Sequence, residues 1–531
     1  MKSLLPLFLT FVIWACSVPQ QLKEGSSNLG DLNHQFSISS AAKPDFDQGL
    51  LLLHSFEYDD AREAFELALD EDPNEVMTYW GLAMTHYKAL WGLQDVDAGR
   101  QVMKQLGADK PARLAKAENQ LERDFWTGVE ILYGEGELKE RNQKYLDHME
   151  QVYQANPNNH EVAAFYSLGL MWAGYDDQEN LSKSSKVVQQ IMKENPTHPG
   201  ALHYMIHAND NPEFAVEAIA AANDYAKVAP DAAHALHMPS HIYVALGMWQ
   251  EVVSSNRDSY DASLKRVEQK QLNGKARGYH SMAWLHYGHL QLGNYDKATS
   301  ILEEMISYHG DGTSSKSYLI MMQNQQRIEA GSWPETLDFQ DIDESALKIG
   351  MEGKAKIHFL KGLLAYDQKD AAAVAKEAAA LETHWEASKL LVNNEGVALC
   401  SAGPTRYAPN QENLTRTAVV IQQIKAMAAI LTDDPTSTEA ALLKAVALEE
   451  EAGYDPGPPF IAYPSFEQYG DWLLEQKRFE EAIAMFDKSL VQRTNRTKAL
   501  RGKLAALKAL DKMEEANEVT KILQKLQVES V

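Results

Sequence analysis

The chain has 531 residues, of which 45% are hydrophobic and 24% are charged, as is usual for a folded protein. Its formal net charge of −25 excludes the basic surface that non-specific nucleic-acid binding needs, so we expect no nucleic-acid partner. The two cysteines, Cys16 and Cys400, exclude a disulfide framework and a multi-cysteine zinc site.

The first predicted element is a signal peptide at residues 1–15. It holds an apolar run that is too short to span a bilayer stably, followed by Ala15 and Cys16. A cysteine directly after a small residue resembles the lipobox of bacterial lipoproteins, although the bulky Trp14 departs from that pattern. The resemblance implies lipidation of Cys16 and attachment to the cell envelope, and Ser17 is compatible with the outer membrane. The alternative is a plain signal peptide that is cut nearby.

Repeats of 34 residues dominate the chain after this segment. The stretch FEYDDAREAFELALDEDPNE carries small, aromatic, small and proline residues at the spacing of the tetratricopeptide repeat, which it resembles. Pro196 and Pro230 lie 34 residues apart, and so do Ala482 and Ala516 near the C-terminus. A third marker is Ala298 in QLGNYDKATSIL.

The resemblance implies an all-α fold, namely a tetratricopeptide-type solenoid of helical hairpins that winds as a right-handed superhelix, with irregular helical insertions. Each hairpin has small residues at its crossing and a proline that ends its second helix. Because one hairpin cannot bury its apolar face alone, neighbours must stack into a continuous core. The repeat register predicts helices that begin at Pro199, Ala233 and Tyr279.

Breaks in the register predict the domain boundaries. The stretch GSWPETLDFQDIDES indicates a linker, and GYDPGPPFIAYPS indicates a connector, because proline and glycine interrupt helices. The predicted segments are the signal peptide (1–15), the lipidated Cys16 with a flexible polar tether (16–42), an N-terminal repeat array with a histidine-rich groove (43–330), the linker (331–345), a middle helical segment (346–452), the connector (453–465) and a C-terminal repeat pair (466–531).

Two histidine pairs are the main candidates for function. His203 and His207 form one pair, and His237 and His241 form the other. The i, i+4 spacing places both imidazoles of a pair on one face of a helix. The pairs are one repeat apart, so they should lie on neighbouring first helices, which pack about 8–10 Å apart. Their imidazoles could then converge on one zinc or copper ion.

Further residues should surround these four. His234, His280 and Asp210 are expected to support the ligands or to line the groove, and Pro239 is expected to kink the helix that carries His241. His54 is predicted to face the groove far along the solenoid. The alternative is that the histidines only hydrogen-bond backbone, tyrosine and asparagine groups in a partly buried wall. Trp80, Trp91, Trp172 and Trp284 are interpreted as core residues.

The segments GALHYMIHAND and HALHMPSHIYVALGMW resemble those of a group of bacterial tetratricopeptide proteins, and this resemblance implies no activity. We find no enzyme signature: after His160 and Glu161, for example, the second histidine of HExxH is missing. We therefore predict no catalytic residue. The predicted function is a lipid-anchored envelope scaffold that binds a protein or peptide in its concave groove. The alternatives are a metal carrier or metal-dependent enzyme that uses the histidines, and an accessory lipoprotein of a nutrient-uptake system.

Overall fold

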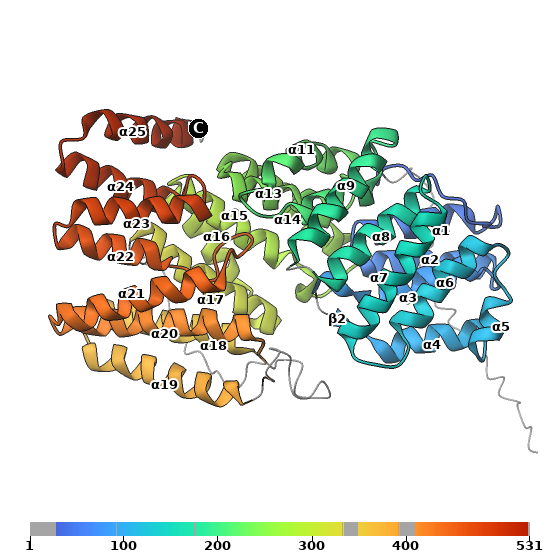
Figure 1. Ribbon diagram of the computed structural model, residues 1–531, viewed down its shortest axis with the longest axis horizontal. Helices are drawn as coiled ribbons and strands as arrows, with labels where there is room; N and C mark the ends of the chain where they lie inside the picture. Colours follow the sequence, from blue (N-terminus) through green and yellow to red (C-terminus); the bar gives the residue numbers. More distant parts are fainter. Residues whose placement is uncertain are drawn as a thin grey trace, which may run out of the picture.

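The computed structural model describes residues 28–91, 93–174, 177–331, 333, 349–390, 392 and 409–528. The predicted signal peptide, Cys16, Cys400 and nearly all of the predicted linker lie outside these ranges. Over the described ranges the chain is a stack of helix pairs, with one short β-hairpin as its only sheet (Figure 1). The prediction of an all-α, tetratricopeptide-type solenoid is therefore confirmed.

The first part of the array runs from α1 to α9. Its elements are α1 (Lys43–His54), α2 (Tyr58–Glu71), α3 (Val76–Thr85), β1 (Tyr87–Lys88), η1 (Ala89–Trp91), β2 (Leu93–Gln94), α4 (Val96–Leu106), α5 (Lys110–Leu114), α6 (Gln120–Leu132), α7 (Leu138–Ala155), α8 (His160–Ala173) and α9 (Gln178–Glu194). Small residues let these helices cross closely. The Phe65 ring of α2 lies between Gly49 and Gly81, and a Cβ at either glycine would overlap it.

The second part carries the histidine pairs. Its elements are α10 (Pro199–Ala208), η2 (Ala215–Ala218), α11 (Ile219–Val228), α12 (Ala233–His237), α13 (Pro239–Leu246), α14 (Trp249–Gln269), η3 (Gly274–Ala276), α15 (Tyr279–Gln291), α16 (Tyr295–Ser307), η4 (His309–Asp311) and α17 (Thr313–Ala330). The three predicted helix starts, Pro199, Ala233 and Tyr279, are confirmed. Pro239 does more than kink its helix: it separates α12 from α13.

The third part is α18 (Met351–Asp367), α19 (Ala371–Lys389), α20 (Gln411–Leu431), α21 (Pro435–Ala452), α22 (Ser465–Glu475), α23 (Phe479–Gln492), α24 (Thr497–Ala509) and α25 (Met513–Val528). It repeats the crossing seen near the N-terminus, with the Phe486 ring between Gly470 and Gly502. By length and composition α20 could cross a membrane, but 67% of its apolar window is buried against neighbouring helices, as in the core of a helical array.

The segment before α1 differs from the predicted flexible tether. The backbone N–H of Asn28 donates to the Asp231 carboxylate (2.8 Å), and Phe36 is buried with its ring edge against Phe125. Residues 28–42 are therefore packed along the array and are not a free tether. Their apolar anchors are few and lie in a polar stretch, which is why composition alone indicates a linker.

The array also curves back on itself. The end of α1 lies against α10. The C-terminal hairpins lie against the middle of the chain (Figure 1). There Trp249 donates its indole N–H to the carbonyl of Asn495 (2.9 Å), and buried Arg496 forms ion pairs with Glu329 and Glu467. This curvature brings first helices from distant repeats to the histidines.

Candidate metal centre

Six histidines form one continuous layer on successive first helices. They are His203 and His207 on α10, His234 and His237 on α12, His241 on α13 and His280 on α15. Their ring nitrogens fall into two groups, in each of which one nitrogen per ring lies within 4.8 Å of the other two. We call His203, His207 and His234 the His203 triad, and His237, His241 and His280 the His237 triad.

The His237 triad has the spacing of ligands that share one ion. The Nε2 atom of His237 lies 3.2 Å from Nε2 of His241 and 3.1 Å from Nε2 of His280. Imidazole nitrogens bind zinc at about 2.0–2.1 Å, so two ligands of a tetrahedral ion lie about 3.3–3.4 Å apart. The three rings are thus close to the arrangement that such an ion requires.

The far side of each ring in this triad has its own partner. Nδ1 of His237 lies 2.7 Å from Oδ1 of Asn256, Nδ1 of His241 lies 2.6 Å from Oδ2 of Asp210, and Nδ1 of His280 lies 2.9 Å from the Tyr318 hydroxyl. The Asn256 amide nitrogen donates elsewhere, so its oxygen accepts, and the Asp210 carboxylate can only accept.

These partners fix where the protons are. His237 and His241 must each donate from Nδ1, so the neutral form of each ring has its lone pair on Nε2. Two lone pairs 3.2 Å apart repel each other, and a cation bound by both removes that repulsion. Metal-binding histidines usually donate their other N–H to a carboxylate or carbonyl in this way. The arrangement therefore fits a transition metal better than it fits a hydrogen-bonded wall.

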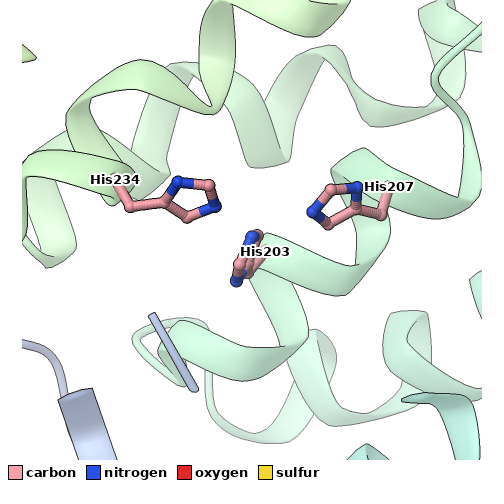
Figure 2. Close-up of side chains that lie close together, drawn as sticks. All are labelled: His203, His207 and His234. Carbon is pink, nitrogen blue, oxygen red and sulfur yellow. The ribbon is translucent and has the colours of Figure 1, made fainter. Parts of the chain in front are cut away.

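The rings of the His203 triad also point toward one another (Figure 2). His203 donates from Nδ1 to the backbone carbonyl of His54 (2.7 Å), so its Nε2 carries a lone pair. That Nε2, both ring nitrogens of His207 and Nε2 of His234 are buried without a hydrogen-bond partner. A buried, unpaired polar atom costs about 1–3 kcal/mol, so four at one place indicate a ligand.

Burial keeps five of these rings neutral, namely those of His203, His207, His234, His237 and His280. It lowers the pKa of His203 to about 3, and it lowers the pKa values of His207 and His237 well below the ordinary value, with neighbouring histidines adding to the shift. Neutral imidazole is the form that binds metals. Within the described residues, these five rings therefore offer donor atoms that are already deprotonated near neutral pH.

The two triads lie side by side. The ring centres of His207 and His241 are 6.1 Å apart, and those of His234 and His237 are also 6.1 Å apart. Neighbouring rings within the triads are only slightly closer, for example 4.8 Å for His203 and His207. The six rings thus form one patch with two possible centres.

The predicted four-ligand set is therefore divided between two centres. His203 and His207 lie in one triad, and His237 and His241 lie in the other. His234 and His280, which we predicted as supporting residues, provide the third ring of each triad. Asp210 does support a ligand, through its bond to His241.

A buried hydrogen-bond network around His54 holds the residue whose carbonyl accepts from His203. His54 is fully buried and does not face a groove: its Nε2 lies 2.8 Å from the Glu161 carboxylate and its Nδ1 lies 2.9 Å from the Tyr204 hydroxyl. Burial alone would raise the pKa of Glu161, but His54 and His198 hold it well below its usual range. Glu161 and His198 have no repeat spacing that would have predicted this role.

Aromatic rings enclose the histidine layer. Phe56 lies edge-on to His203 with ring centres 4.4 Å apart, and it also stacks on His234. Trp284 is buried against His241, as expected for a core residue. Trp91 was also expected in the core, but 46% of its surface is exposed beside His234.

Comparisons with known proteins identify no family and no ligand. No family model matches the sequence, and a search of curated proteins finds no match. The chain is similar to the solved structures of the APC/C hetero-tetramer Cut9–Hcn1 (13% identity, 90% of this chain and 79% of that chain, TM-score 0.35), the human IFIT1 dimer with m7Gppp-AAAA (13%, 93% and 96%, 0.34) and yeast Tom70 (10%, 92% and 92%, 0.30). Likenesses this distant carry no argument about ligands or partners. The chain's own helix pairs and triads define a tetratricopeptide-type solenoid with a histidine layer.

Proposed function

We propose that this protein binds a transition-metal ion through His237, His241 and His280. The observation that carries the proposal is the convergence of the three Nε2 atoms, each on a ring whose Nδ1 has its own partner. A wall of histidines used only for packing has no reason to turn three Nε2 atoms toward one point.

The donor set selects the class of metal. Imidazole suits zinc, copper, iron and nickel, whereas calcium and magnesium prefer oxygen ligands. Three protein ligands leave a coordination position open, as in catalytic zinc sites, whereas structural zinc sites have four protein ligands. Since His280 is exposed, the open position is accessible to a small molecule or to a metal-transfer partner. A metal-dependent enzyme and a metal carrier both use such a site.

Titration of the purified full chain tests the proposal. We expect one zinc ion to be lost when His280→Ala removes the exposed ligand, because two imidazoles hold zinc poorly. The matched control is His309→Ala, a half-buried histidine whose ring hydrogen-bonds the Ile306 carbonyl. Equal zinc binding by the wild type and His280→Ala would refute the assignment.

A second candidate function is a scaffold that binds a protein or peptide. The solenoid fold supports it, because stacked repeats offer extended concave surfaces, and so does the exposed indole of Trp91. In that case Trp91→Ala should abolish cross-linking to the protein partner and leave zinc binding unchanged. Conversely, if His280→Ala abolishes zinc binding but keeps the partner, the two functions are independent.

For location we retain the expectation from the sequence. The lipobox-like residues around Cys16 support a lipid-anchored protein of the bacterial cell envelope, at the outer membrane. A metal site on an envelope protein would then meet ions and small molecules outside the cytoplasm. The role of accessory lipoprotein in nutrient uptake fits the same location.

A further inference from the structure

We propose that the two triads together hold a pair of copper ions that share one small bridging ligand. When both ions are copper(I), the pair binds dioxygen, which becomes the bridging ligand. The proposal rests on metal binding by the His237 triad and adds a second ion at His203, His207 and His234. It goes beyond a single ion because it assigns a partner to each of the six rings.

The second ion follows from the donor atoms of the His203 triad. His203 is fully buried, and its Nδ1 is committed to the His54 carbonyl, so only Nε2 is left to bind a ligand. His207 is 8% exposed and has no partner on either nitrogen. No described donor or acceptor satisfies these atoms, and a cation at the centre of the three rings would bind one nitrogen of each ring.

The bridge follows from the contact between the triads. His207 faces His241 and His234 faces His237, in both cases with ring centres 6.1 Å apart. Each ion would have three protein ligands and therefore open positions. Two-metal sites place their ions about 3.5–4 Å apart and share a small ligand between them. The open positions of two adjoining triads are the place for such a ligand.

Charge selects the metal. A pair of divalent ions needs anionic ligands, whereas each triad supplies only imidazole nitrogens, and the one unpaired carboxylate oxygen beside the layer is Oδ1 of Asp210. Asp210 binds Nδ1 of His241, on the other side of the ring from Nε2, and Glu57 accepts the backbone N–H of His234. Two copper(I) ions repel each other about four times less than two divalent ions at the same distance. A set of six imidazole ligands, which brings no negative charge, therefore favours copper(I), and imidazole also suits copper(II).

The same argument gives the bridging ligand. When the pair is oxidised, its charge doubles and an anion must enter. Dioxygen supplies that anion: each copper(I) gives up one electron, and dioxygen gains two electrons to become peroxide between two copper(II) ions. No proton or other reactant is needed. Phe56 and Trp284 line the layer with apolar surface, which admits dioxygen readily.

Anaerobic loading of the full chain with copper(I), followed by gel filtration and elemental analysis, tests the pair. We expect two copper ions per chain, and one in His280→Ala, in His207→Ala and in the gentler His207→Gln. His309→Ala should keep two. One copper in the wild type that is lost in His280→Ala would overturn the pair while the proposed function stands. No copper and no zinc in the wild type would overturn both.

Dioxygen then tests the bridge. Two copper(II) ions joined by a bridging ligand couple their spins, so the oxidised wild type should give almost no electron paramagnetic resonance signal and should take up one dioxygen per pair. His207→Gln, with one copper, should give the signal of an isolated ion once it is oxidised. Two copper ions with the full signal of two isolated centres would overturn the shared ligand. Circular dichroism spectra of each variant check that the helices are intact.

Discussion

The bond between Asp210 and His241 provides the most discriminating prediction of the metal site. Asp210 is only 7% exposed, and its Oδ2 lies 2.6 Å from Nδ1 of His241. The carboxylate both orients the ring and makes Nε2 a better donor. Loss of such a partner typically lowers metal affinity about 10–100-fold, which is about 1.4–2.7 kcal/mol.

Two substitutions separate these effects. Asp210→Asn keeps an acceptor for the Nδ1 proton but removes the charge, so we expect a loss near the tenfold end. Asp210→Ala removes both, and we expect a loss near the hundredfold end. The measurement is competition for zinc with a chromophoric chelator, made in the His207→Ala background so that only the His237 triad reports. Asp109→Asn, at the N-terminal cap of α5 in the first part of the array, is the control. Unchanged affinity in Asp210→Ala would refute the reasoning.

Four further predictions concern stability and location. Zinc at 100 times its Kd should stabilise the fold by about 2.7 kcal/mol, seen as a higher Tm that His280→Ala abolishes. Burial lowers the pKa of His286 to about 4 in the folded chain, below its ordinary 6.5, so metal-free protein should lose stability as the pH falls from 6.5 to 4, and His286→Gln should make that loss smaller in denaturant titrations by up to about 3 kcal/mol. Gly81→Ala should destabilise the fold by about 1–3 kcal/mol because its Cβ overlaps the Phe65 ring, whereas Gly310→Ala, with no atom within 4 Å, should not. Cys16→Ser should release the protein from the membrane fraction, and continued attachment would rule out the anchor.

Much of the fold follows from the sequence because the repeat leaves a periodic signal. Small residues must lie where helices cross, and proline must lie where they end, so the register predicts the starts of α10, α12 and α15 to the residue. The 34-residue period does not predict how strongly the array curves. The small rotations between repeats add up to bring α1 beside α10, and neither the packed segment 28–42 nor the burial of His54 could be read from spacing.

The candidate site shows the same limit. The i, i+4 spacing predicts that His203 and His207 share one helix face and that His237 and His241 share another. His234, His280 and Asp210 were predicted only as supporting or groove residues. The spacing does not predict which rings meet across helices, because that depends on the break between α12 and α13 and on the angle between α10 and α12. Asn256 and Tyr318, which hold the far sides of two rings, come from α14 and α17 and have no sequence pattern of their own.

Anomalous X-ray diffraction from crystals of the metal-loaded protein tests the central claim most directly. We predict a peak about 2.0–2.1 Å from the Nε2 atoms of His237, His241 and His280 at the absorption edge of the bound metal. A metal-loaded crystal whose anomalous peaks all lie away from these three nitrogens would contradict the account.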